Sequence, residues 1–203
     1  MFGLDARIAL AIFGVLSVIS GASLYSAIQN AEAVRMAATL SELEKAIEQY
    51  MLDTGSYLPE KQSNMNVLVA GNLYSNINGN SGWDGPYFGW KGLTDTIYIE
   101  NLWTDVNSSY SIFRHRAESW RSDINLVSAK SCNSSDCMMY LHKAAAPATD
   151  LYNDVYRSYT LLEELVDNNY GPGVGRVRAK ISSFDSYLSV YYRLLPEYIK
   201  LDS

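Results

Sequence analysis

Residues 8–31 read IALAIFGVLSVISGASLYSAIQNA and contain no charged side chain. As an α-helix this apolar stretch would measure about 36 Å, at about 1.5 Å per residue. The hydrocarbon layer of a bilayer is about 30 Å thick, so the stretch is long enough to cross a membrane. The preceding residues, MFGLDAR, hold one acidic and one basic side chain. A cleavable secretory signal would instead begin with a positively charged segment, so we favour a helix that stays on the chain.

The helical pattern continues beyond the apolar stretch, from residue 32 to residue 53. Apolar side chains recur at steps of three and four residues, and charged or amide side chains mostly stand between them. The recurring residues are Met36, Leu40, Leu43, Ile47 and Tyr50. This pattern predicts one rod over residues 1–53, about 80 Å long if unbroken, whose second half buries one stripe against a head. Gly55, followed by Pro59, is expected to end the rod.

The chain has 203 residues, enough for one globular domain with a hydrophobic core and an extension. We expect an apolar helix for a membrane or a fibre core at residues 1–31, its amphipathic continuation at 32–54, and a globular head at 55–203. Such a rod is typical of a membrane anchor with a stalk and also of a helix that builds a filament. The sequence pattern leaves both interpretations open.

The head is predicted to be α+β, with short strands separated by Gly, Asn and Ser. Strand candidates rich in Tyr, Ile, Val and Leu are 96–102, 110–113, 124–129 and 187–195. Between residues 148 and 166 apolar side chains return to helical spacing, and NNYGPGVG then ends that helix. The expected architecture is a long N-terminal helix packed on a small antiparallel sheet, with one additional helix.

Net charge and composition argue against nucleic acid as a partner. The chain carries 16 basic and 22 acidic residues, a formal charge of −6, and no long cluster of Lys and Arg. Sixteen tyrosines and four tryptophans suit β-structure and contact surfaces. This composition by itself assigns no function.

Cys132 and Cys137 enclose four residues in the segment SCNSSDC. A small disulfide loop is the favoured interpretation, and it implies an oxidising compartment outside the cytoplasm. It would stabilise the fold by only about 2 kcal/mol. Free thiols are the alternative, while a metal site would need further ligands that His115 and His142 do little to supply.

No catalytic or cofactor-binding pattern stands out, so neither enzymatic activity nor a cofactor is expected. The sequence has no G-x-S-x-G, no H-E-x-x-H and no phosphate-binding loop, and GPGVG is expected to form a turn. Asp167, Asn168 and Asn169 offer oxygens for calcium, but they follow no EF-hand pattern, and no metal is expected. The sequons at Asn107 and Asn133 are common by chance.

The N-terminal sequence resembles mature type IV pilins and the related pseudopilins of type II secretion. The resemblance rests on the apolar stretch, its amphipathic continuation and TGSYLP, so it covers about the first sixty residues. In that family a prepilin peptidase removes a short basic leader, the new first residue is N-methylated, and an acid stands at the fifth position. Met1 is then the expected mature first residue, as in the type IVb group, and Asp5 is the acid, where the family usually has glutamate.

The resemblance implies a type IV pilin fold and a role as a structural subunit. The subunit would be stored in the inner membrane, extracted by an assembly platform and polymerised with itself into an extracellular type IV pilus. Alternatives are a minor pilin, a pseudopilin of a secretion or DNA-uptake machine, and, from another class, a binding domain on a single-pass anchor.

Asp5 needs a partner if its helix enters a fibre core, because an unpaired carboxylate is costly to remove from water. We expect that partner to be the α-amino group of Met1 in a neighbouring subunit, which would fix the axial register. The alternative pairs Asp5 with Arg7 or with solvent at the membrane surface.

Gly14 and Gly21 place two residues without a Cβ inside the apolar stretch. One interpretation is close packing between helices, which small residues permit in lipid and in fibres. The other, implied by related pili, is local melting of the helix on assembly, although those pili usually carry a proline where this chain has Ala22.

A weaker echo of the same family lies near the C-terminal end, where DNNYGPGVGRVRAKI resembles a glycine loop followed by the entry of a strand. In many pilins a cysteine pair brackets a long C-terminal loop, whereas Cys132 and Cys137 lie in the middle of this chain around a short one. This placement departs from the customary disulfide-bounded surface region of that family.

Overall fold

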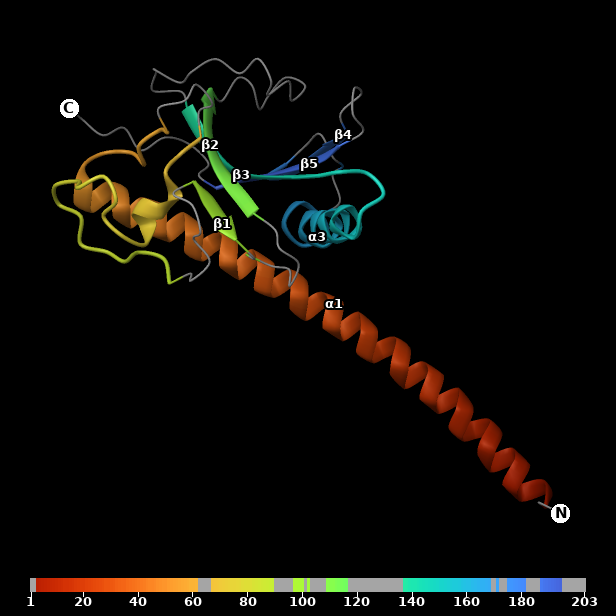
Figure 1. The fold of residues 1–203 in the computed structure, drawn as a ribbon. Helices are drawn as coiled ribbons and strands as arrows, with labels where there is room; N and C mark the ends of the chain where they lie inside the picture. Colours follow the sequence, from red (N-terminus) through yellow and green to blue (C-terminus); the bar gives the residue numbers. More distant parts are fainter. Residues whose placement is uncertain are drawn as a thin grey trace.

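The computed structural model describes residues 3–61, 67–89, 97–100, 102, 109–116, 137–168, 171, 175–181 and 187–194. A long helix, α1 (Leu4–Thr54), projects from a head whose described part holds a further helix and a sheet (Figure 1). The other elements are listed here in chain order. They are η1 (Ala70–Leu73), β1 (Tyr98–Glu100), β2 (Ser109–Arg116), β3 (Cys137–Ala145), α3 (Asp150–Asp167), β4 (Val177–Ile181) and β5 (Leu188–Arg193). This arrangement confirms the predicted α+β class.

The helix α1 is continuous over 51 residues, which corresponds to about 77 Å. Its last residue is followed by Gly55 in the left-handed conformation (φ 63°), which glycine adopts without steric cost. The predicted rod over residues 1–53 and its end at Gly55 are therefore confirmed for the part of the chain that the structure describes. Met1 and Phe2 lie outside that part.

The five strands form one antiparallel sheet with the order β1-β2-β3-β5-β4. In β3 and β5 the side chains alternate, so that Met139, Leu141, Val190 and Tyr192 point into the core. Residues 32–54 of α1 and the whole of α3 lie on this same side of the sheet (Figure 1). One hydrophobic core between the helices and the sheet holds the head together.

The helix α3 begins after the N-cap residue Thr149, whose hydroxyl accepts a hydrogen bond from the Tyr152 amide (3.1 Å). Its apolar stripe includes Val155 and Leu162, which are almost fully buried. The helix ends at Asn168, which takes a left-handed conformation (φ 54°) that asparagine tolerates better than most residues. The predicted helix at residues 148–166 is thus confirmed to within two residues.

Three of the predicted strands agree with the sheet, and the fourth is not tested. The candidates 96–102, 110–113 and 187–195 contain or overlap β1, β2 and β5. The candidate at 124–129 lies outside the described residues. The strand entry in the family resemblance over residues 167–181 falls at β4, whereas β3 was not predicted at all. In β3 the charged Lys143 stands among the core-facing residues, and the strand ends in two alanines. The alternation of apolar and polar residues that is typical of a half-buried strand is therefore not visible in the sequence.

Candidate assembly interface

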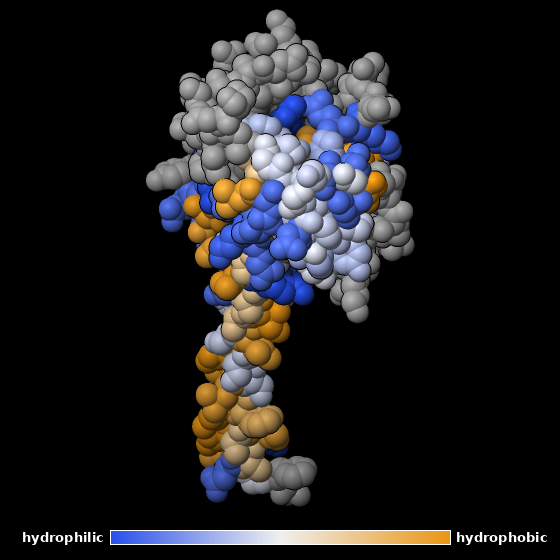
Figure 2. Space-filling model, turned by 90° about the vertical axis from the view of Figure 1, so that its left-hand side faces the viewer, coloured by the Kyte–Doolittle hydropathy of each residue, from blue (hydrophilic) through white to orange (hydrophobic). Residues whose placement is uncertain are grey.

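The lower half of α1, residues 4–31, has no head beside it. Its large apolar side chains are exposed, for example Phe13 at 70%, Leu16 at 56% and Leu24 at 63%. Figure 2 shows this apolar surface below a head whose visible surface is mostly hydrophilic. The helix is long and apolar enough to cross a membrane, and none of its most apolar part is buried in the chain. So much exposed apolar surface requires a lipid or protein environment.

The upper half of α1, residues 32–54, is amphipathic and belongs to the head. Its buried residues recur every three or four positions, and Leu43, Ile47 and Tyr50 have no exposed surface. The ring of Tyr50 also meets the edge of the Tyr87 ring at 5.8 Å. The buried stripe of this half contains all five residues that the sequence analysis placed at helical spacing: Met36, Leu40, Leu43, Ile47 and Tyr50.

Two ion pairs fix the upper half of α1 to the head. Arg157 on α3 binds Glu32 at 2.5 Å, at the level where the helix enters the head. Arg176, just before β4, binds Glu44 and also donates to the Arg193 carbonyl. Partners in the first pair are 125 positions apart in the sequence, so the sequence analysis did not find them.

Asp5 lies in the first turn of α1 and is exposed. A carboxylate in that turn interacts favourably with the helix dipole. Among the described residues, no hydrogen bond or ion pair reaches the Asp5 side chain, so the pairing with Arg7 is absent within the single chain. Its expected partner, the α-amino group of Met1 in a neighbouring subunit, lies outside the described residues and remains a prediction.

Gly14 and Gly21 sit in regular helix. A Cβ built at either position would meet no atom within 4 Å, so nothing in the single chain requires glycine there. The helix is unbroken between them. Close packing against other helices and local melting on assembly both concern the assembled state, and both remain predictions.

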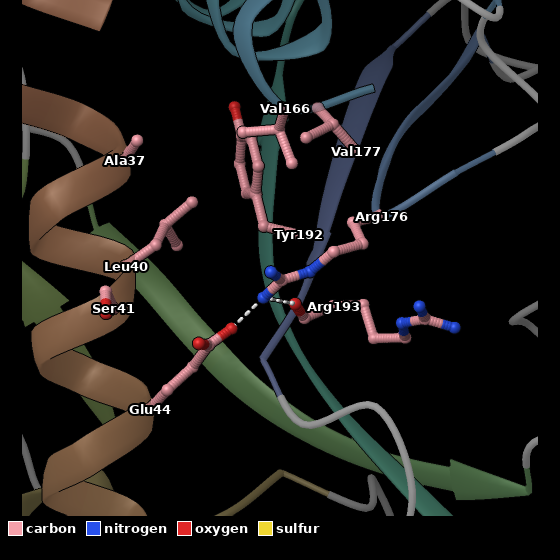
Figure 3. Close-up of a pocket in the computed structure, with 9 residues that line it drawn as sticks. All are labelled: Ala37, Leu40, Ser41, Glu44, Val166, Arg176, Val177, Tyr192 and Arg193. Atoms are coloured by element: carbon pink, nitrogen blue, oxygen red, sulfur yellow. Dashed lines mark hydrogen bonds and ion pairs between the residues drawn. The ribbon is translucent and has the colours of Figure 1, made fainter. Parts of the chain in front are cut away.

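A pocket of about 140 Å³ lies at the seam between α1 and the head (Figure 3). We call it the seam pocket. Its α1 wall consists of Ala37, Leu40 and Ser41, and its head wall of Val166, Val177 and Tyr192. Glu44, Arg176 and Arg193 form its polar rim. Sequence reasoning did not find it, because its walls come from segments far apart in the chain.

Lys143 is a buried cation on the core side of the sheet, with only 5% of its surface exposed. Its Nζ donates to the Ser109 carbonyl at 3.0 Å and lies 5.4 Å from the centre of the Tyr110 ring. Burial lowers the pKa of Lys143 to about 8. Since no carboxylate among the described residues pairs with it, this lysine weakens the fold at neutral pH.

The remaining candidate residues do not converge on a chemical site. Cys137 lies in β3 with its backbone opposite Arg116, but Cys132 lies outside the described residues, so the disulfide remains a prediction. The imidazole of His142 stacks on Tyr191 at 4.9 Å within an aromatic cluster. One oxygen of Asp167 accepts a hydrogen bond from the Val177 amide at 2.6 Å, so this carboxylate joins the end of α3 to the start of β4. Asn169 lies outside the described residues.

Comparison with known proteins gives one matching family model. A family model for protein G of the type II secretion system matches residues 23–101, which is less than half of the chain. The matched segment starts in the lower half of α1, includes the whole upper half and ends directly after β1. No curated protein and no solved structure matches the chain.

Proposed function

We propose that this chain builds an extracellular type IV pilus. It is a member of the type IV pilin and pseudopilin superfamily and a filament subunit of that kind. The observation that carries this proposal is the division of α1. A stable head leaves about half of a continuous helix without a partner in its own chain. Copies of that apolar half, packed together, would remove the exposed surface from water.

The energetics support a transfer from lipid to fibre. A buried Leu, Ile, Val or Phe side chain contributes about 1.5 to 3 kcal/mol relative to exposure to water. Lipid and a helical core of sister copies both provide such burial, so moving between them costs little on this account. The chain is thus a membrane-anchored subunit before assembly. Contacts that run head to tail without closing produce a filament.

The three parts of the chain have different roles in this proposal. Residues 1–31 anchor the subunit and then form the fibre core, residues 32–54 connect that core to the head, and residues 55–203 form the outer surface. Asp5 and the α-amino group of Met1 in a neighbouring copy would neutralise one another in the core. A prepilin peptidase and an assembly platform in the inner membrane are the partners that the superfamily implies.

A second candidate is a pseudopilin of a type II secretion system, because the family model that matches residues 23–101 describes protein G of that system. In that case the same lower half would build a short filament that serves secretion. In both candidates the filament forms through packing of the lower halves of α1. They differ in the location of the filament and in the process that it supports.

Fibres sheared from the surface of cells that express the chain test the first proposal. We expect the chain to be their main component by mass spectrometry, and deletion of its gene to remove the fibres. If the chain is missing from such fibres and the deletion strain has a secretion defect, the pseudopilin function is favoured over the pilus function. A chain that remains single in the membrane would contradict both.

A further inference from the structure

The seam pocket lies directly above the apolar half of α1, on the same helix. Four residues at helical spacing connect the two: Val34, Ala37, Ala38 and Ser41. Val34 and Ala38 are exposed, and Ala37 and Ser41, which line the pocket, are half-buried. The stripe is made of small or apolar side chains, so it lets another helix approach α1 closely. A helix lying along the stripe would therefore pass over the mouth of the pocket.

The size of the pocket fits one bulky apolar side chain. An apolar cavity of about 150 Å³ holds a single benzene ring, and the seam pocket has about 140 Å³. Its inner walls are formed by Leu40, Val166 and Val177 together with the Tyr192 ring (Figure 3). A leucine, isoleucine or phenylalanine side chain is thus the matching occupant.

The rim of the pocket carries two guanidinium groups and one carboxylate, from Arg176, Arg193 and Glu44. The Arg176 guanidinium binds both the Glu44 carboxylate and the Arg193 carbonyl. The Glu44 carboxylate is therefore already paired, and the apolar inner walls decide which group fits inside. A neutral apolar group is the chemistry that the pocket accepts.

We propose that the seam pocket receives one large apolar side chain from the lower half of α1 in a second copy of the chain. This inference rests on the proposed filament function and specifies which surface of the head region accepts the neighbouring helix. Phe13, Leu16 and Leu24 belong to the exposed side chains that match the pocket in chemistry and size. The contact also sets the axial offset between two copies, because one position along the lower half must lie beside residue 41.

Filling the pocket tests the steric part of the proposal. Ser41→Phe is expected to reduce fibre yield about tenfold, which corresponds to the loss of about 1.4 kcal/mol per contact. Ser41→Ala, which keeps the pocket open, is expected to assemble like the wild type. Lys45→Phe adds the same ring to an exposed position one turn further along α1 and serves as the control for added bulk. Near-ultraviolet circular dichroism checks that each head is folded.

Cysteine cross-linking tests the contact itself without filling the pocket. Ser41→Cys is nearly isosteric, and it would be paired with single cysteines at successive positions from 10 to 28 in full-length chains assembled into fibres. We expect oxidised dimers at one or two positions that are three or four residues apart. Ser41→Cys alone reports any coupling to the native cysteines.

Each result decides the proposal. Suppose that the wild type forms fibres. The proposed pocket contact is then wrong if Ser41→Phe assembles normally, or if no position between 10 and 28 cross-links to residue 41, and in either case the filament function is unaffected. If the wild type forms no fibres, the filament function itself is wrong.

Discussion

The two halves of α1 form one uninterrupted helix, yet their surroundings are opposite. In the upper half Leu43 and Ile47 are completely buried by the head, while in the lower half Leu16 and Leu24 are more than half exposed. The upper half alternates apolar and polar faces, whereas the lower half is apolar on nearly every face. The difference shows that the upper half completes the core of its own chain, whereas the lower half needs lipid or other protein to cover its apolar surface.

The largest effect is expected from removing the lower half altogether. A chain that begins at residue 32 keeps every buried residue of α1, so its head should fold with the thermal stability of the intact chain. Membrane binding and fibre formation should be lost completely. Circular dichroism and flotation with vesicles would measure the two properties. An unfolded head would show that the head needs the lower half of α1 for its folding, which would contradict the division of the helix into two independent halves.

A second prediction concerns the charge at the tip of the lower half. Asp5→Ala should lower fibre yield about tenfold or more, because the neighbouring α-amino group would then enter the core unpaired. Asp5→Glu keeps the charge and should assemble efficiently. Electron microscopy of sheared fibres measures both. Head stability should not change in either variant, and normal assembly of Asp5→Ala would contradict the pairing with the amino group.

A leucine truncation in each half sharpens the comparison in energetic terms. Leu43→Ala should destabilise the head by about 2 to 5 kcal/mol, since it leaves a cavity in a packed core. Leu16→Ala removes the same atoms from an exposed position and should leave the free energy of unfolding unchanged in detergent. Chemical denaturation followed by tryptophan fluorescence provides the measurement. Equal losses in the two variants would mean that the lower half contacts the head.

The pH dependence of head stability provides a further test that does not involve the lower half. Unfolding raises the pKa of Lys143 from about 8 to its ordinary value of 10.5, so the unfolded chain binds more protons between these values. Stability should therefore rise from pH 8 to about pH 10. Above that, buried tyrosines such as Tyr140 and Tyr192, whose pKa burial raises, should reverse the trend.

Replacing the lysine isolates its contribution. Lys143→Met should stabilise the head by up to about 3 kcal/mol at pH 7 and should remove the rise above pH 8. The same change is expected in the chain that begins at residue 32. A loss of stability in Lys143→Met would show that the contacts with Ser109 and Tyr110 outweigh the cost of burial.

The smallest effect is expected at the boundary between the halves. Glu32→Gln breaks the ion pair with Arg157, whose side chain is 44% exposed, so the head should lose less than about 1 kcal/mol. The loss should decrease as salt is added. A loss of several kcal/mol would mean that residue 32 belongs to the core of the head and that the boundary lies lower on α1.

Much of the fold could be predicted because its signals are local. The uncharged run and the amphipathic continuation predict α1 and its two environments, and Gly55 marks its end through a conformation that glycine favours. The helix α3 was found in the same way from its apolar spacing. The strand β3 was missed because Lys143 interrupts the apolar face, and only the folded head provides the carbonyl and the ring that accept this lysine.

The assembly site was predicted only in part. Asp5, Gly14 and Gly21 were proposed as assembly residues because a charge just before the apolar stretch and glycines within it are conspicuous, and their roles remain predictions. The seam pocket could not be identified, because Ala37 and Ser41 meet Val166 and Tyr192 only after the sheet has formed. Contacts of that kind depend on topology, which a single sequence does not specify.

Cryo-microscopy of fibres assembled by the wild-type chain tests the central claim most directly. We expect a reconstruction with the lower halves of α1 packed against one another along the axis, the heads outside, and density for Asp5 beside the first residue of a neighbouring copy. Fibres whose cores lack these helices would contradict the account. A chain that stays monomeric in the bilayer and never polymerises would contradict it as well.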